Sequence, residues 1–317
     1  MTTSTPATEV SGPPRARRRR GAGPGGDGMR RTGTGRGRRG VRAGRGARRL
    51  LLHGVLLVGG FCWLYPLLWG LSGSLKSQED FLNSGLGLNP GSPRWANFSS
   101  AWNGARIGRY FFNTVLVSAS TVALTLLFAA AAGYVLARTR FPGRKVLLVV
   151  VAVTFFLPHG YTIVPIYDMI TALGLGSSLI AVVLVQVAGG MVFNTFMFMG
   201  YFRTVTRDIE EAAMVDGANF HQLFFRIALP LARPMLATLG LFTLIQSWNN
   251  FMTPLIFTLG HPEDRTIAVG LYAFIGQTST DWSSLLAGSV ISLAPVVLVF
   301  AFAQRHIVAA IAGAVKG

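Results

Sequence analysis

Long apolar stretches alternate with short polar segments over most of the chain. Six of these stretches are long enough to cross a membrane, which takes about 20 apolar residues per helix. They cover residues 50–71, 110–137, 146–166, 179–201, 235–259 and 285–303. They are continuous rather than alternating in polarity, which favours helices over the strands of a membrane barrel. The pattern therefore predicts an all-α, polytopic membrane protein with six transmembrane helices.

A polar segment between the fourth and fifth apolar stretches is the most distinctive part of the chain. It predicts two short helices joined by a left-handed turn at Gly217. Asp208, with Glu211 three residues later, is predicted to cap the first helix. Asn219 with Gln222 repeats this arrangement and is predicted to cap the second helix.

The end and the surface of this segment also follow a pattern. Pro230 is predicted to stop the second helix, because proline lacks the backbone donor that continues one. Ala212 and Ala213 keep the first helix narrow enough to approach another protein closely. An apolar face at helical spacing is formed by Phe220, Phe224, Ile227 and Leu231. The segment is therefore predicted to dock into a groove of a partner.

Composition and charge agree with a membrane protein and orient it. Hydrophobic residues make up 51% of the chain, charged residues 13%, and the mean hydropathy is +0.47, which is too apolar for an ordinary soluble protein. The basic segments 1–49, 138–145 and 203–233 fall on one side of the membrane if the chain crosses it six times. Because basic loops stay in the cytoplasm, both termini are predicted to be cytoplasmic.

The first 49 residues hold fourteen arginines, which account for much of the net charge of +17. Arginine mixed with glycine and small polar residues predicts a disordered cytoplasmic tail over 1–49, followed by a membrane domain over 50–317. Such a tail is able to bind anionic membrane lipid or, nonspecifically, nucleic acid. The lipid interpretation is favoured because the tail lies directly beside the first apolar stretch.

Motifs for independent catalysis are absent from the sequence. There is no Gly-x-x-x-x-Gly-Lys-Ser/Thr phosphate loop, no His-Glu-x-x-His pattern and no nucleophile elbow. The five histidines are scattered without the spacing of metal ligands. The chain is therefore predicted to have no catalytic residues, no metal site, no cofactor and no nucleotide site of its own.

The polar segment closely resembles the EAA loop of ATP-binding-cassette importer permeases. The matching residues are Glu211-Ala-Ala213, Gly217 and Ile227-Ala-Leu229-Pro230. Further segments resemble the carbohydrate-uptake, maltose-type branch: Ile163-Val-Pro165-Ile-Tyr167, Leu173-Gly-Leu175, Ser247-Trp-Asn-Asn250-Phe, Pro254-Leu-Ile256 and Gly313-Ala-Val-Lys-Gly317. The resemblance covers residues 50–317 and leaves out the basic tail. Thr206 stands where the family usually has proline, and it is predicted to cap the first helix instead.

This resemblance implies a permease subunit in a bacterial cell membrane that imports a sugar or oligosaccharide. Its partners would be ATP-binding subunits that hold ATP and magnesium, a second permease and an extracytoplasmic solute-binding protein. The residues implied in coupling to the ATPase are Glu211, Ala212, Ala213, Asp216, Gly217, Ile227, Leu229 and Pro230. Two alternatives stay open: Glu211 only caps its own helix, or the segment is a DNA-binding helix-turn-helix, which its position between two spans disfavours.

Polar residues inside the apolar stretches are the candidates for a substrate pathway, because they are costly when they face lipid. They are Gln186, Asn194, Gln246, Trp248, Asn249 and Asn250. Amides and an aromatic face suit a sugar, although hydrogen bonds between helices explain such residues equally well. Pro158 and Gly160 predict a kink, and hence a gate, in the third stretch, or else its outer end.

Three other functions are compatible with parts of this pattern. A permease of the same superfamily for another solute would share the loop. A secondary transporter independent of ATPases would need carboxylates in its spans, and the clearest candidate, Asp168, lies at the edge of one. A scaffold that holds nucleic acid through its tail is a third possibility.

Overall fold

The computed structural model describes residues 37–104, 106–156, 162–272, 274–276 and 280–314. Its internal contacts divide the chain into two units, residues 1–60 and 61–317. In the part described, the first unit consists of the beginning of helix α1 (Gly37–Ser74), which starts inside the segment predicted as a tail. An isolated pairing of Ile275 with Thr280 is the only β-bridge among the described residues.

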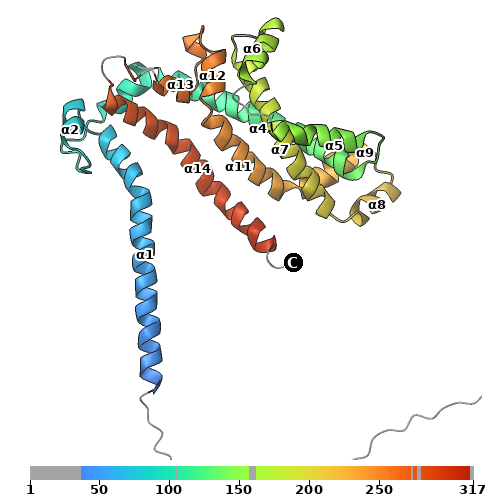
Figure 1. The fold of residues 1–317 in the computed structure, drawn as a ribbon, viewed down its shortest axis with the longest axis horizontal. Helices are drawn as coiled ribbons and strands as arrows, with labels where there is room; N and C mark the ends of the chain where they lie inside the picture. The colour runs from blue at the N-terminus through green and yellow to red at the C-terminus, as the bar shows by residue number, and fades with distance from the viewer. Residues whose placement is uncertain (1–36, 105, 157–161, 273, 277–279, 315–317) are drawn as a thin grey trace, which may run out of the picture. The chain divides into compact units, whose positions relative to one another are not determined.

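Apart from this bridge and the connecting loops, the described part of the second unit is helical (Figure 1). Its longer helices are α4 (Ile107–Arg138), α5 (Arg144–Val153), α6 (Ile163–Ala172), α7 (Leu179–Thr204), α8 (Asp208–Val215), α11 (Arg233–Trp248) and α14 (Trp282–Ala314). Shorter helical segments are α2 (Gln78–Asn83), α3 (Ala96–Ser99), η1 (Ser100–Gly104), η2 (Thr154–Phe156), α9 (Phe220–Gln222), η3 (Leu223–Ala228), α10 (Leu229–Leu231), α12 (Met252–Phe257), η4 (Pro262–Asp264) and α13 (Ile267–Tyr272).

Four helices in the described part of the chain are long and apolar enough to cross a membrane. They are Leu51–Ser74, Ile107–Arg138, Leu179–Thr204 and Trp282–Phe302, and each corresponds to a predicted span. A fifth candidate is a bent pair, Phe220–Leu231 with Arg233–Trp248. The span predicted over 146–166 includes residues 157–161, which lie outside the described residues. The count of six spans therefore stays a prediction.

The apolar stretch 235–259 forms two helices rather than one unbroken span. Helix α11 ends at Trp248 and α12 begins at Met252. The side chain of Asn250, two residues before α12, accepts the backbone N–H of Thr253 at 3.1 Å, which satisfies one donor of the first turn. Pro254 lacks the backbone N–H that would donate to the carbonyl of residue 250 if α11 and α12 were one continuous helix. The break between the two helices therefore falls at the polar residues 249 and 250.

Small residues on α4 allow it to pack closely against α7. Ala129 is fully buried, and Gly133 lies one helical turn further on. A Cβ added to Gly133 would lie 2.7 Å from the Cβ of Phe198 and 2.9 Å from the backbone nitrogen of Met199. Because the two backbones approach this closely, α4 and α7 form the central pair of the second unit.

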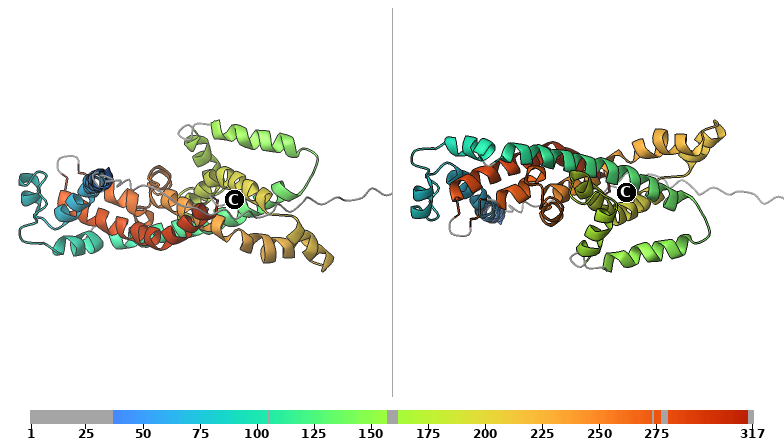
Figure 2. Two further views of the ribbon diagram at one scale, coloured as in Figure 1. Left: turned by 90° about the horizontal axis from the view of Figure 1, so that it is seen from below. Right: turned by 90° about the horizontal axis from the view of Figure 1, so that it is seen from above.

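The core around this pair extends to the segment that joins α7 to α11. Its buried residues are Ala129, Ala130, Tyr134, Phe198, Phe202, Phe224, Ala228, Ala232 and Leu239. Helices α8 and α2 lie at opposite ends of the second unit, as Figures 1 and 2 show. Helix α5 stands apart from the other helices in Figure 2, and none of its residues is buried. Its apolar surface is left for lipid or a partner to cover.

Candidate functional site

The candidate site is the coupling loop, defined as residues 205–232 between α7 and α11. Helix α8 of this loop begins at Asp208, and its N-cap residue, Arg207, makes no capping bond with its side chain. The predictions that Asp208 or Thr206 caps this helix are therefore wrong. Asp208 lies inside the first turn together with Glu210 and Glu211. Three carboxylates near the positive end of the helix dipole stabilise the helix in place of a cap.

The end of α8 matches the prediction of a turn at Gly217. This glycine has φ +87°, in the left-handed region that favours glycine. The N–H of Gly217 donates to the carbonyl of Met214 at 3.0 Å, and the N–H of Ala218 donates to that of Ala213 at 2.9 Å. These two bonds form a Schellman motif, which satisfies the last carbonyls of the helix.

The start of the second helix is also as predicted. The side chain of Asn219 accepts the backbone N–H of Gln222, and the side chain of Gln222 accepts the backbone N–H of Asn219, each at 2.9 Å. This reciprocal pair is a capping box, and it fixes where α9 begins. The predicted cap is therefore confirmed.

The second helix ends one residue beyond Pro230, close to the predicted stop. The helical run continues to Leu231, and the chain bends by 74° between Phe220–Leu231 and Arg233–Trp248. The six residues before α10 are wound as a π-helix, in which the N–H of Leu229 donates to the carbonyl of Phe224. This wider turn accommodates a proline inside a helix.

The predicted docking face of the second helix is only partly free, because Phe224 is buried in its own chain. Leu223, Phe224 and Ala228 are the buried residues of η3, packed in the core of their own chain. Phe220 and Leu231, predicted on the docking face, are 44% and 40% exposed. Phe225 on η3 is 53% exposed as well. On α8, three more apolar side chains face outward: Ile209, Met214 and Val215, at 47%, 50% and 88% exposed. Both helices of the loop therefore offer apolar surface to a partner.

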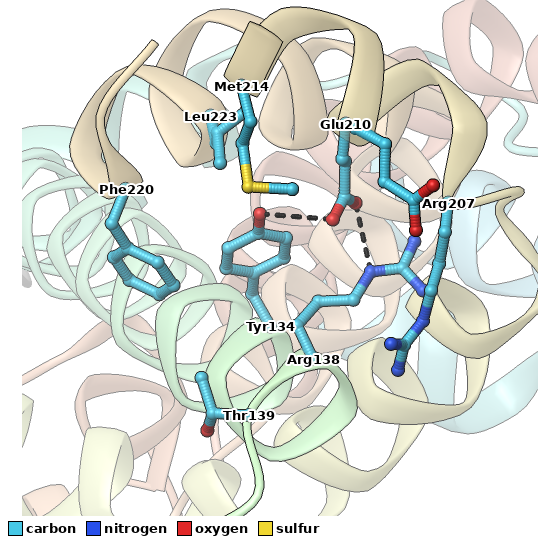
Figure 3. Close-up of a pocket in the computed structure, with 9 residues that line it drawn as sticks. Tyr134, Arg138, Thr139, Arg207, Glu210, Met214, Phe220 and Leu223 are labelled. Carbon is cyan, nitrogen blue, oxygen red and sulfur yellow. Dashed lines mark hydrogen bonds and ion pairs between the residues drawn. The ribbon is translucent and has the colours of Figure 1, made fainter. Parts of the chain in front are cut away.

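A buried ion pair ties the coupling loop to α4 (Figure 3). Arg138 Nε lies 2.9 Å from Glu210 Oε1, and the two side chains are only 8% and 9% exposed. Arg138 also donates from Nη2 to the carbonyl of Val205 at 2.9 Å. Tyr134 donates its hydroxyl to Glu210 Oε2 at 3.4 Å. Glu210 was not indicated by the sequence analysis, which singled out its neighbour Glu211.

A cavity of about 190 Å³ lies beside this ion pair. It is lined by Tyr134, Arg138, Thr139, Arg207, Glu210, Glu211, Met214, Phe220 and Leu223. Glu211 and Asp216 are exposed, and their side chains make no hydrogen bond among the residues the structure describes. Their carboxylates are therefore available to basic groups of a partner.

The other predicted coupling residues lie along the same loop. Ala212 is exposed and Ala213 half-buried, so a partner is able to approach α8 on that side. Ile227, Leu229 and Pro230 are half-buried, within or next to the π-helical segment. Their part in coupling stays a prediction.

The predicted pathway residues differ in how deeply they are buried and in what they contact. Gln186, on α7, accepts a bond from Ser247 Oγ on α11 at 2.5 Å, so it lies between two helices. Asn194 is 4% exposed and donates to the carbonyl of Gly190 at 2.8 Å, a bond within α7. Trp248 is 5% exposed and donates from Nε1 to the carbonyl of Ser292 at 3.1 Å.

The remaining pathway residues lie nearer the surface. Gln246 and Asn249 are exposed, and Asn249 donates to the carbonyl of Ile245 at 3.0 Å. Asn250 accepts the backbone N–H of Thr253. All of the predicted pathway residues except Gln246 thus make internal bonds, and the structure does not gather the six residues into one site. The predicted gate residues Pro158 and Gly160 lie outside the described residues.

Comparisons with known proteins point to a transport component of a membrane. Residues 129–313 match a family described as the binding-protein-dependent transport system inner membrane component. The chain is 38% identical over 254 residues to the probable ABC transporter permease protein YurM of Bacillus subtilis, covering 80% of this chain and 84% of that protein. It is 34% identical over 258 residues to the diacetylchitobiose uptake system permease protein NgcG of Streptomyces coelicolor, with the same two coverages.

A solved structure shares the fold. A chain of a bacterial ABC transporter that imports the acidic polysaccharide alginate matches with a TM-score of 0.70 at 24% identity. The match covers 82% of this chain and 97% of that chain. The helical arrangement of the second unit is thus one already seen in a transporter.

Proposed function

Because the chain belongs to the family of binding-protein-dependent transport system inner membrane components, we propose that it is the permease subunit of an importer for a sugar or oligosaccharide. Support for a carbohydrate comes from relatives such as NgcG and the arabinooligosaccharides permease AraQ of Bacillus subtilis, which is 31% identical over 259 residues. The partners are ATP-binding subunits, a second permease and an extracytoplasmic binding protein. ATP and magnesium are bound by the ATP-binding subunits.

The coupling loop is the observation that carries this proposal. Its helix α8 lies at one end of the second unit and exposes Glu211 beside Met214 and Val215 (Figure 1). A carboxylate next to apolar side chains suits docking on a partner that carries basic and apolar groups. The basic residues that flank the loop support a cytoplasmic position for it and for both termini.

Transport then follows from two states of the helical bundle. ATP binding closes the ATPase subunits, and the coupling loop conveys their movement to the spans, which alternate between outward and inward access. Such a switch needs two packings of similar free energy, each preferred by one nucleotide state. This chain supplies the loop and the helices, while its partners supply the driving reaction.

The proposal is tested by uptake into membrane vesicles that carry this chain with the other subunits of its own importer. We expect ATP-dependent, binding-protein-dependent uptake of a labelled disaccharide or oligosaccharide. Uptake of only amino acids or phosphate would assign another solute class. Uptake driven by an ion gradient without ATP would contradict the proposal and favour a secondary transporter.

Removal of residues 1–45 is expected to leave this uptake unchanged, because the tail precedes the first apolar stretch and the family match begins far beyond it. The measurement is the initial uptake rate at equal amounts of inserted protein. Loss of uptake with normal insertion would contradict the transport assignment of the membrane domain and favour a function carried by the basic tail.

A further inference from the structure

We propose that Arg138 and Glu210 are positioning residues that fix the coupling loop to α4 and α7, so that these two helices move with it. The inference rests on the proposed function, because it assigns the path by which the movement of an ATPase enters the bundle. Glu211 faces the partner, whereas Glu210 holds the loop to its own chain.

The contacts of Arg138 join three helices at one point. Its guanidinium pairs with Glu210 on α8 at 2.9 Å and donates to the carbonyl of Val205, the C-cap residue that follows α7, at 2.9 Å. Arg138 is itself the last residue of α4. One side chain therefore connects the end of α4 with the end of α7 and the first turn of α8. An arginine suits this place because its planar guanidinium is able to donate in two directions.

The burial of the pair makes this connection rigid. Both side chains are more than nine-tenths buried, and among the described residues Arg138 and Glu210 form the only ion pair between an arginine and a carboxylate. Removing one member leaves the other charged and unpaired in a buried place, which is strongly unfavourable. The loop therefore does not separate from α4 easily while both residues are present.

A second contact one helical turn earlier on α4 holds the other half of the loop. Tyr134 lies on the same face of α4 as Arg138. Its ring centroid is 5.4 Å from those of Phe202 on α7, Phe220 on α9 and Phe224 on η3. Its hydroxyl donates to Glu210 at 3.4 Å. Both helices of the coupling loop are therefore attached to the same turns of α4.

The consecutive residues Glu210 and Glu211 lie about 100° apart around the axis of α8. Both line the cavity beside Arg138, but only Glu210 forms an ion pair with it. Glu210 is 7% exposed and faces Arg138, whereas Glu211 is exposed. This difference separates attachment to the chain from attachment to the partner. It also provides a matched pair of variants, Glu210→Gln and Glu211→Gln, that remove the same charge one residue apart.

The first experiment compares these variants in the complete importer, reconstituted in proteoliposomes. Two quantities are measured: retention of the ATPase subunits on the purified complex, and solute transported per ATP hydrolysed. We expect Glu210→Gln to retain the ATPase but to transport about tenfold less solute per ATP, within the usual range of coupling between sites. We expect Glu211→Gln to weaken retention. Asp208→Asn, on the same turn of α8, serves as the exposed control.

The second experiment replaces the ion pair by a covalent link. In a Cys62→Ala background, Arg138→Cys and Glu210→Cys are joined by a short, reducible bis-methanethiosulfonate reagent. We expect the linked importer to recover most of the solute transported per ATP, and reduction to lower it again about tenfold. A purely structural defect of the double variant would not respond to reduction in this way.

Each outcome decides between the claims. Normal transport per ATP in Glu210→Gln, or equal transport by the linked and reduced forms, would overturn the inference. If neither Glu210→Gln nor Glu211→Gln changes retention or transport, the proposed docking of the coupling loop fails as well.

If Glu210→Gln does not assemble, the exchanged pair Arg138→Glu with Glu210→Arg takes its place. Recovery of coupled transport by the exchange supports the inference, and assembly without recovery overturns it.

Discussion

Replacing Glu211 by lysine is expected to abolish solute uptake and to release the ATPase subunits from the permease. Glu211 is exposed on α8, beside Met214 and Val215, and its side chain makes no hydrogen bond within the described part of the chain. A lysine there would face the basic groups that the carboxylate is proposed to meet. Like charges placed opposite each other across an interface are strongly unfavourable, so docking is lost.

The measurement is binding-protein-dependent uptake together with the amount of ATPase that copurifies with the permease. Glu79→Lys is the matched control, because it makes the same change of charge on an exposed carboxylate of α2, at the other end of the second unit. Insertion in the membrane should be equal for both variants. Normal uptake by Glu211→Lys would show that α8 does not dock through this residue.

Replacing Gly133 by valine is expected to prevent α4 and α7 from packing, and so to remove most of the folded permease. A Cβ at this position would lie 2.7 Å from the Cβ of Phe198, 2.9 Å from the nitrogen of Met199 and 3.0 Å from the carbonyl oxygen of Thr195. Two of these three atoms belong to the backbone of α7, which is unable to move aside as a side chain would. Overpacking of a tight contact typically costs about 1–3 kcal/mol, and the γ-methyl groups of valine add to it.

The yield of monodisperse permease after extraction in detergent, and its midpoint of thermal unfolding, measure this effect. Gly189→Val is the matched control, because a Cβ at Gly189 on α7 meets no atom within 4 Å. We expect the control to keep the yield and the midpoint of the unchanged chain. Equal yields and midpoints for the two variants would mean that the close contact at Gly133 does not set the packing of α4 on α7.

Features that depend on neighbouring residues were predictable from the sequence. The capping box of Asn219 with Gln222 and the left-handed turn at Gly217 each involve groups only a few residues apart. The apolar stretches gave four of the spans to within a few residues, because length and hydropathy decide them. The end of the second helix was likewise predictable to within one residue, since the helix stops at Leu231, directly after Pro230.

Features that depend on packing were not predictable in this way. Arg138 and Glu210 are separated by 72 residues, and no local pattern distinguishes Glu210 from Glu211. Only the fold places one carboxylate against α4 and leaves the other exposed. The same holds for Trp248, which suited a sugar by its chemistry but is buried and bonded to the carbonyl of Ser292. Polar residues within apolar helices thus stabilise the bundle as readily as they line a pathway.

Site-specific photo-crosslinking from Val215 tests the central claim most directly, namely that the coupling loop contacts the ATPase. Val215 is 88% exposed on α8, so a benzoylphenylalanine placed there leaves the core of the chain unchanged. In the assembled importer, irradiated without nucleotide and with bound ATP, we expect a crosslinked product of this chain with the ATPase subunit. Products confined to this chain or to lipid in both states, with the complex intact, would contradict the claim.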